Sequence, residues 1–426
     1  MNSFENVIGH ESVKAEFIKF ADVIKNNEKY AELGVSIPSG ILLYGEPGVG
    51  KTLMAKAFIE EAGCDVFTIR KDMPNGEFVK HIKDTFEEAK KHAPAIVFLD
   101  DMDKFANEDE MHRNAEEYVA VQSCIDDCKG MGIFTLATVN AMDRLPGSLL
   151  REGRFDKHIE ISNLTGKDSV KIIKYFLSKK KVDDNVDLEE LGRILEGKTC
   201  AFLETVINEA GIYAGFRNSK TLNHDDIIKA FLRMEFDVPE CLEKEEVDNV
   251  RFVAIHEAGH AVVHEILDPH SVTLVSVYKG EYSDEGIVRC QKSDKYQYLK
   301  ELQEHDVIGA LGGKAASEIV LGKADTGCNA DLHRAFSRVS KFVDNYCSLG
   351  FNAFESRNSS DYLLTNKDRL IASEMERYYG TAKTILTENR DFLDAIVEAL
   401  IDHKTITYRE MQTLRDRHVQ NLSIGA

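Results

Sequence analysis

Short apolar runs and helical patterns alternate along the first part of the chain. Each run is bounded by Gly, Pro, Asp or Asn, and the runs are Gly40–Tyr44, Val66–Ile69, Ile96–Leu99 and Ile133–Val139. Runs of this kind are typical of strands that are buried on both faces, as in a parallel sheet with helices on each side. We therefore predict an α/β domain over residues 1–160.

Helical patterns dominate the rest of the chain. They fill residues 161–237, which we predict to be a helical domain, and a proline with a run of charges then indicates a linker at 238–248. A second, mainly α-helical domain is predicted over residues 249–426. Its one exception is Ser271–Arg289, which we expect to form a hairpin that turns around Lys279–Asp284. The predicted fold class is therefore multidomain, α/β followed by mainly α.

Composition and charge narrow the classes of function. The 426 residues carry a formal net charge of −20, so the chain lacks the excess of Lys and Arg that general nucleic-acid binding requires. No apolar stretch approaches the roughly 20 residues that span a bilayer, and no signal peptide is recognisable. The eight cysteines are scattered, so we expect reduced thiols, with a disulfide framework or a cysteine zinc site as the lesser alternative. These features predict a soluble, cytoplasmic protein that binds no nucleic acid and encodes no membrane association.

A phosphate-binding loop is indicated at Gly45–Thr52, between the predicted strand Ile41–Tyr44 and a helical run. Its glycines let backbone N–H groups surround a β-phosphate at the helix N-terminus. Lys51 would bridge the β- and γ-phosphates of ATP, and Thr52 would contribute an oxygen to Mg²⁺. The candidate nucleotide-binding residues in this loop are Glu46, Pro47, Gly48, Val49, Gly50, Lys51, Thr52 and Leu53.

A second apolar strand, Ile96–Leu99, ends in two acids that suit the same site. Asp100 would orient the magnesium ion, and Asp101 stands where a base would polarise the attacking water. A strand that merely ends in an Asp-capped turn is the plain alternative, and the neighbouring phosphate loop makes the nucleotide interpretation the stronger one.

The segment around His256 has the pattern HExxH within a predicted helix. Its spacing places His256 and His260 one turn apart on one face, so that both imidazoles can reach one zinc ion. Glu257 would then act as the general base and acid of peptide hydrolysis. We interpret His264, one turn further on, as a solvent-facing or packing residue. Two histidines leave zinc short of a third protein ligand.

The first part of the chain resembles an AAA+ ATPase of the FtsH type. The resemblance is carried by Phe4–Gly9, the phosphate loop, Phe86–Asp103, Thr135–Leu145 and Leu149–Asp156. It implies that Val7, Ile8 and Gly9 line the adenine pocket and that Asn140 senses the γ-phosphate. It also implies that Arg151 and Arg154 reach the ATP of a neighbouring subunit, which requires a homo-oligomeric ring, expected to be a hexamer.

The last domain resembles the zincin-like M41 peptidase domain of the same family. In that family a distant Asp after a Thr-Gly turn completes the zinc site, and the matching segment Asp325–Leu332 points to Asp331. His333 and Asp325 remain the alternatives. The run Val272–Tyr278 resembles the family's edge strand, on which an extended substrate could pair, although a plain structural hairpin also fits.

Several positions depart from the family pattern. Asp101 stands where a Glu is usual, and the stretch Lys71–Phe78, which matches the pore loop, offers only Met73 and Phe78 near the expected aromatic position. The start of the lid helix, Gly197–Phe202, lacks the family's Gly-Ala-Asp run. The family is normally anchored in a membrane at its N-terminus, so the chain is either a soluble relative or part of an anchored protein.

These features together predict an ATP-dependent zinc metalloendopeptidase that unfolds and degrades polypeptides as a ring, with Zn²⁺, ATP and Mg²⁺ as cofactors. An ATP-modulated peptidase of unfolded peptides and an AAA+ remodelling chaperone with weak proteolysis are the alternatives.

Overall fold

The computed structural model describes residues 3–34, 38–107, 115–238, 244–278, 286–291, 299–323, 327–346, 350 and 360–425. The chain divides into two compact units, one formed by Met1–Lys180 with Glu196–Asn208 and the other by Lys181–Leu195 with Glu209–Ala426. The segment 161–237, predicted as a separate helical domain, is therefore shared between the two units. No helix in the described ranges is long and apolar enough to cross a membrane.

A five-stranded parallel sheet forms the centre of the first unit. Its strand order is β2-β3-β4-β1-β5, and the strands are β1 (Gly40–Tyr44), β2 (Asp65–Ile69), β3 (Ala95–Leu99), β4 (Ile133–Val139) and β5 (Lys157–Glu160). The four predicted strands are confirmed. The inner strands β3, β4 and β1 are buried almost throughout, whereas β2 is mostly exposed because it lies at an edge. No apolar run predicted β5, which lies at the opposite edge and buries only Ile159.

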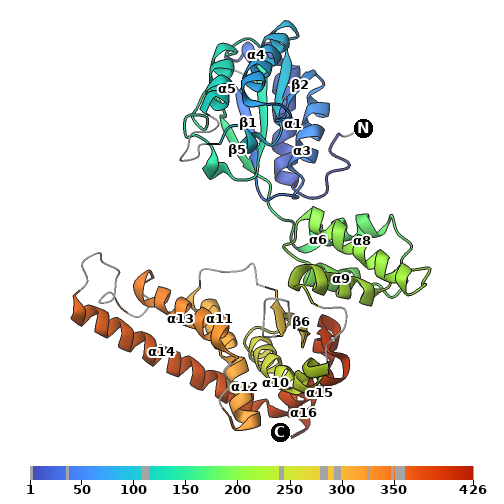
Figure 1. Cartoon of the computed structure of the whole chain (residues 1–426), viewed down its shortest axis with the longest axis vertical. Coiled ribbons are helices and arrows are strands. Elements are labelled where there is room, and N and C mark those ends of the chain that lie inside the picture. Colours follow the sequence, from blue (N-terminus) through green and yellow to red (C-terminus); the bar gives the residue numbers. More distant parts are fainter. Residues whose placement is uncertain are drawn as a thin grey trace. The chain divides into compact units, whose positions relative to one another are not determined.

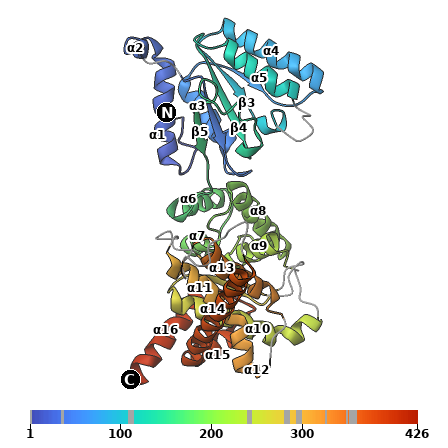
Figure 2. The same cartoon turned by 90° about the vertical axis from the view of Figure 1, so that its left-hand side faces the viewer.

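Helices cover both faces of this sheet (Figure 2). One face is covered by α1 (Glu11–Lys25) and α3 (Lys51–Ala62), and the short α2 (Asn27–Ala31) follows α1 along the chain. The ring of Phe58 contacts those of Phe17 and Phe134 in the core on this face. The other face is covered by α4 (Asn75–Lys91) and α5 (Ala115–Asp127). Because the strands are parallel, the loops that follow β1, β3 and β4 meet at one edge of the sheet, where ligands bind in folds of this type.

Four helices follow the sheet along the chain. They are α6 (Gly166–Leu177), α7 (Leu188–Ile194), α8 (Cys200–Phe216) and α9 (His224–Phe236), drawn in green in Figure 1. The side chain of Asn223 accepts a hydrogen bond from the backbone of Asp226, whose own carboxylate accepts one from Asn223, so α9 begins with a reciprocal cap.

The buried helix α10 (Lys244–Leu267) organises the second unit. Helices packed around this core are α11 (Lys300–Ala310), α12 (Gly312–Leu321), α13 (Asn329–Asp344), α14 (Asp361–Glu388), α15 (Arg390–His403) and α16 (Tyr408–Gly425). Helix α10 begins inside the segment 238–248 that we predicted as a linker. The acidic and basic residues there suit a helix as well as a loop, and the charge run alone could not separate the two.

A small antiparallel sheet completes the second unit, with the order β7-β6-β8. Its strands are β6 (Val272–Ser276), β7 (Ile287–Cys290) and β8 (Thr405–Thr407). The predicted hairpin is confirmed by the pairing of β6 with β7, while its turn at 279–285 lies outside the described residues. The prediction of Val272–Tyr278 as an edge strand is wrong, because β6 pairs with β7 on one side and with β8 on the other. Among the described residues, β7 forms an edge of this sheet.

Candidate metal centre and nucleotide site

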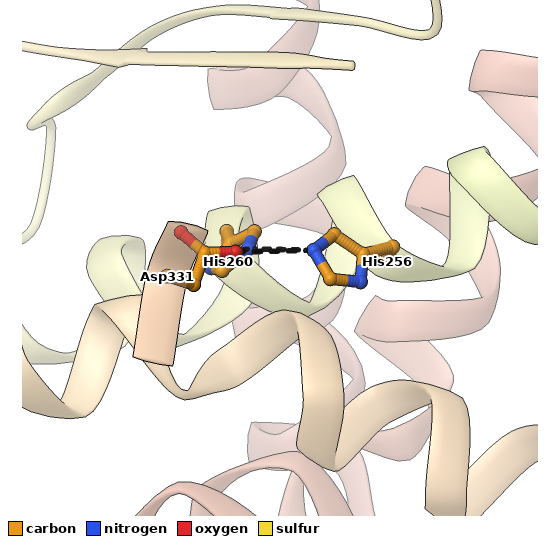
Figure 3. A group of neighbouring side chains, drawn as sticks. All are labelled: His256, His260 and Asp331. Atoms are coloured by element: carbon orange, nitrogen blue, oxygen red, sulfur yellow. Dashed lines mark hydrogen bonds and ion pairs between the residues drawn. The ribbon is translucent and has the colours of Figure 1, made fainter. Parts of the chain in front are cut away.

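Three buried side chains converge between helices α10 and α13. The ligand atoms of His256, His260 and Asp331 all lie within 4.8 Å of one another. The Nε2 atoms of His256 and His260 are 3.1 Å apart, and Asp331 Oδ2 lies 3.2 Å from the first and 2.9 Å from the second (Figure 3). Two imidazoles on successive helical turns and one carboxylate form a donor set that zinc prefers.

Neighbouring groups fix the orientation of these ligands. The Nδ1 of His260 lies 2.7 Å from the carbonyl oxygen of Gly309, so it carries the proton and leaves Nε2 free for a metal. Asp331 directs Oδ2 at the imidazoles, while its Oδ1 accepts a hydrogen bond from Arg334. Burial opposes ionisation of Asp331, but the contacts with the imidazoles of His256 and His260 prevail and hold its pKa well below the usual value.

A glycine provides the space that this centre needs. A Cβ atom on Gly313 of α12 would lie 2.5 Å from Nε2 of His256 and 2.6 Å from Nε2 of His260. Any other residue would therefore fill the position that the imidazole nitrogens surround. The donor set and this hollow both fit a zinc ion.

Glu257 lies beside the metal centre without belonging to it. Its exposed fraction is 3%, and a Cβ on Gly286, the residue before β7, would lie 2.6 Å from its Cγ. The carboxyl group is therefore held where the edge strand β7 begins. A buried proton acceptor that directly follows a zinc ligand in the chain and lies against the start of β7 suits the hydrolysis of an extended chain.

The predicted phosphate loop connects β1 to α3. The Nζ of Lys51 donates to the carbonyl oxygens of Gly45 at 2.7 Å and Glu46 at 2.8 Å, and to Asn140 Oδ1 at 2.9 Å. Burial lowers the pKa of Lys51. The sheet thus brings together Lys51 and Asn140, which are far apart in the sequence and were predicted to share the γ-phosphate.

Asp100 is buried beside this loop at the end of β3. Its Oδ1 accepts hydrogen bonds from Thr138 at 2.9 Å and from Thr52 at 3.2 Å, and its Oδ2 accepts one from Arg70. Burial alone would raise the pKa of Asp100, but these hydrogen bonds outweigh it and lower the pKa. Thr52 and Asp100 therefore lie together, as expected for two groups that hold one magnesium ion.

The start of α8 packs directly on the phosphate loop. The backbone N–H of Ala201 donates to the carbonyl oxygen of Gly48 at 3.1 Å, and a Cβ on Gly48 would lie 2.7 Å from the Cβ of Ala201. This contact comes from the segment Gly197–Phe202 that departs from the family pattern. The departure therefore leaves the contact between this helix and the loop in place.

Comparisons with known proteins agree with both sites. Residues 41–163 match the ATPase family associated with various cellular activities, and residues 244–414 match peptidase family M41. The ATP-dependent zinc metalloprotease FtsH of Caldicellulosiruptor bescii is 31% identical over 445 residues, covering 97% of this chain and 72% of that protein. FtsH 2 of a Thermoanaerobacter species is 31% identical over 432 residues, covering 97% of this chain and 82% of that protein.

This chain belongs to the FtsH family. FtsH of Bacillus subtilis is a further relative, 30% identical over 453 residues that cover 97% of this chain and 70% of that protein. Membership confirms the predicted fold class, an AAA α/β domain followed by a helical M41 domain. It also confirms the predicted class of activity, ATP-dependent zinc proteolysis, and the predicted cofactors zinc and ATP.

The predicted adenine segment of this FtsH-family chain is firmly packed. Val7 is buried in the core, and Gly9 has a φ of 74°, which favours glycine. A Cβ on Gly9 would lie 2.6 Å from the side chain of Leu164 and 3.3 Å from Asp168. The segment that contains Ile8 is thereby fixed against the start of α6.

Three residues predicted to act in ATP hydrolysis, Asp101, Arg151 and Arg154, differ in the contacts that their side chains make. Asp101 has a φ of 54° and its carboxylate accepts a hydrogen bond from Lys104 at 2.7 Å, so it faces partly toward solvent. Arg154 donates to Asp126 of its own chain at 2.8 Å. Arg151 is exposed and makes no side-chain hydrogen bond to the part of the chain that the structure describes.

Of the two alternative zinc ligands, the structure describes only His333, and it does not belong to the ligand cluster. His333 is exposed, and Asp325 lies outside the described residues. His264, which we interpreted as a solvent-facing or packing residue and not a ligand, packs against Gly309, where a Cβ would lie 2.3 Å from its ring. Burial lowers the pKa of His264 to about 4, so the ring is neutral.

Sequence reasoning missed three contributors to these sites, Arg70, Arg334 and Gly313. The run Gly309-Ala-Leu-Gly312-Gly313 carried a usable signal, because glycines inside a helical pattern often mark a close approach of another element. No comparable signal exists for the two arginines, since a single Arg next to a strand or on an exposed helix face is common.

Proposed function

We propose that this FtsH-family chain hydrolyses peptide bonds in polypeptides, with zinc held by His256, His260 and Asp331 and with Glu257 as general base and acid. The observation that carries the proposal is the convergence of those three ligand atoms within 4.8 Å beside a buried Glu257. Bound zinc supplies a Lewis acid that polarises the scissile carbonyl and makes water more acidic. Glu257 takes the proton from the attacking water and later gives it to the leaving amine.

The edge strand β7 provides a place for the substrate. Gly286 brings the beginning of β7 against Glu257, and an extended peptide that adds to the edge of β7, which no described strand covers, would pass the catalytic carboxylate. A cavity of about 390 Å³ lies at the far end of β7, lined by residues that include Cys290, His264 and His305. It would receive a side chain of the bound peptide.

The first unit would bind and hydrolyse ATP. Lys51 now donates to two loop carbonyls and to Asn140, and phosphate oxygens would replace the carbonyls as acceptors. Thr52 and Asp100 would hold Mg²⁺, Asp101 would polarise water, and Val7–Gly9 would contact adenine. In this proposal residues 1–160 form the nucleotide-binding domain, residues 161–237 its lid and residues 249–426 the peptidase domain.

The active form would be a homo-oligomeric ring, which we propose to be a hexamer. Arg151 supports a role across a subunit interface because it is exposed. Arg154 is engaged with Asp126, so it would have to release that carboxylate before it could reach a neighbour's ATP. We therefore assign the trans-acting role first to Arg151.

A second candidate function, a peptidase that uses ATP without forceful threading, is favoured by one observation. Phe78 is fully buried against Phe105, and Met73 packs on the same core. Phe78 is therefore not presented for gripping a threaded chain, and Met73 is presented only in part. An unfolded substrate such as casein would be degraded under both functions, whereas a stably folded, tagged protein would be degraded only if the ring unfolds it.

The decisive test replaces Glu257 by Gln. The amide keeps the size of the side chain and cannot accept the water proton, so we expect casein degradation to fall by at least about a hundredfold. Bound zinc and ATP hydrolysis should stay at the level of the unaltered protein. Degradation that continues at the original rate would overturn the proposed function.

A further inference from the structure

Arg70 occupies an unusual place at the nucleotide site. It follows β2 directly, and because Ile69 of β2 is paired with Leu99 of β3, Arg70 and Asp100 lie side by side at the carboxyl end of the sheet. The guanidinium donates to Asp100 Oδ2, while Oδ1 accepts from Thr52 and Thr138. Both oxygens of the carboxylate assigned to Mg²⁺ thus have hydrogen-bond donors.

The two partners differ in how easily they can leave this contact. The side chain of Arg70 is 60% exposed, whereas that of Asp100 is 2% exposed. A divalent cation beside Asp100 would repel the guanidinium, because two cations near one carboxylate raise each other's electrostatic energy. Arg70 can then move into water at small cost because it is already largely hydrated, but Asp100 is fixed by the sheet.

Arg70 is also joined to the segment Lys71–Phe78. Its neighbour Lys71 donates to the buried Glu117 of α5 at 2.9 Å and lies 4.5 Å from the ring centre of Phe78. Two adjacent cations therefore attach the start of this segment, one to α5 and one to the carboxylate of the nucleotide site. Releasing the second attachment would leave the start of the segment held from the α5 side, while Met73 and Phe78 still pack on the core.

We propose that Arg70 is the counter-ion of Asp100 in the absence of nucleotide and that Mg²⁺ displaces it, which loosens the start of the segment Lys71–Phe78. The inference rests on the proposed nucleotide function, in which Asp100 orients Mg²⁺. It gives this chain a direct path from occupancy of the magnesium site to the segment that corresponds to the pore loop. Arg70 is a positioning residue here, because it acts through Asp100.

The first experiment measures how binding of a fluorescent, non-hydrolysable ATP analogue depends on Mg²⁺. Removal of the competing charge in Arg70→Gln should lower the half-saturating Mg²⁺ concentration by roughly three- to tenfold. Arg70→Lys, which keeps the charge, should stay close to the unaltered protein. Lys71→Gln is the matched control, because it removes the adjacent cation without touching Asp100, and it should leave the Mg²⁺ dependence unchanged.

The outcomes separate this inference from the function on which it rests. If the unaltered protein binds no nucleotide at any Mg²⁺ concentration, the proposed ATPase function and the inference both fail. If nucleotide binds and Arg70→Gln shows the same Mg²⁺ dependence as the unaltered protein, the inference alone is overturned.

The second experiment follows hydrogen exchange of the amides in residues 71–78. In the unaltered protein Mg²⁺ with the analogue should speed exchange there, and the analogue without Mg²⁺ should not. In Arg70→Gln exchange should be fast in every condition, because the attachment is already absent. If the rate of hydrogen exchange in the unaltered protein is the same with and without Mg²⁺, the proposed displacement is contradicted.

Discussion

Asp331 uses its two carboxylate oxygens for different partners. Oδ2 lies 2.9 to 3.2 Å from the two imidazoles, and Oδ1 accepts from the exposed Arg334, one turn further along α13. This division leaves one oxygen for a metal and keeps the other away from it. Arg334 therefore orients the ligand without touching the imidazoles, in the way that outer hydrogen bonds position metal ligands.

Replacing Arg334 by Gln should weaken zinc binding by about tenfold, within the range that loss of an outer-shell partner produces. Competition with a chromophoric chelator measures this affinity independently of catalysis. Arg338→Gln is the matched control, because that arginine lies on the same helix but pairs with Asp306 at 2.6 Å. Equal zinc affinity in Arg334→Gln and Arg338→Gln would remove the positioning role.

His264 makes the stability of the second unit depend on pH. Burial lowers its pKa from about 6.5 to about 4, while charges of His260, Asp306 and Arg334 add smaller effects. The unfolded chain therefore binds a proton that the folded chain does not bind between these values. The contribution of the neutral ring is fully present above pH 6.5 and is lost as the pH falls toward 4.

We expect the unfolding free energy to fall by up to about 3 kcal/mol over this interval through His264 alone. In His264→Gln the fall should be smaller by that amount. Urea unfolding of both proteins at pH 7, 5.5 and 4, with zinc removed from both, measures the difference. If the unfolding free energies of the two proteins change equally with pH, the pKa of His264 is the same in the folded and the unfolded chain, and the prediction is wrong.

At the scale of elements, close contact between helices builds the metal centre. A Cβ on Gly259 of α10 would lie 2.5 Å from the carbonyl oxygen of Gly312 and 2.5 Å from the Cβ of Ala316. Helices α10 and α12 therefore touch through their backbones, and this approach brings Gly313 under the imidazoles of His256 and His260. The glycines are part of the site although they bind nothing.

Gly259→Ala should force these helices apart and lower the unfolding free energy by about 1 to 3 kcal/mol, as overpacking usually does. Gly380→Ala is the control, since Gly380 lies inside α14 and a Cβ there would meet nothing within 4 Å. That change should be neutral or stabilise by up to about 1 kcal/mol. Thermal unfolding of the two variants tests the prediction, and similar midpoints would contradict it.

Apolar runs predicted the strands of the large sheet that contain several consecutive apolar residues and missed the strand that contains only one. The run Ile96–Leu99 was recognisable because β3 is buried on both faces, whereas Lys157–Glu160 was not, because an edge strand needs only Ile159. The edge position of β7 could not be predicted, since β6 gains its second neighbour from Thr405–Thr407, more than a hundred residues later.

The same limit applies to the candidate sites. His256 and His260 follow from local spacing because one helix carries both. Asp331 was assigned through resemblance, since the fold and not the spacing brings it to the histidines. Arg70 and Arg334 depend on which carboxylate lies beside them, and that is a tertiary contact that no local pattern encodes.

At the scale of the whole molecule, the nucleotide site and the metal centre are built from separate sets of residues. The side chains around the phosphate loop, Lys51, Thr52, Asp100 and Asn140, belong to the first compact unit, and the zinc ligands with Glu257 belong to the second. No residue is shared between the two candidate sites. Loss of nucleotide binding should therefore leave the metal centre chemically intact.

Lys51→Ala tests this separation. Removal of the ammonium group should abolish ATP hydrolysis and lower nucleotide affinity at least about tenfold, because no other described side chain donates to the same loop carbonyls and Asn140. Zinc content should remain equal to that of the unaltered protein, and a short fluorogenic peptide should still be cleaved, since it needs no unfolding. Folded substrates should no longer be degraded. Loss of zinc in Lys51→Ala, measured by metal analysis, would show instead that the nucleotide site supports the metal centre. Glu257→Gln is the reciprocal variant, because it should lose peptide cleavage and retain ATP hydrolysis.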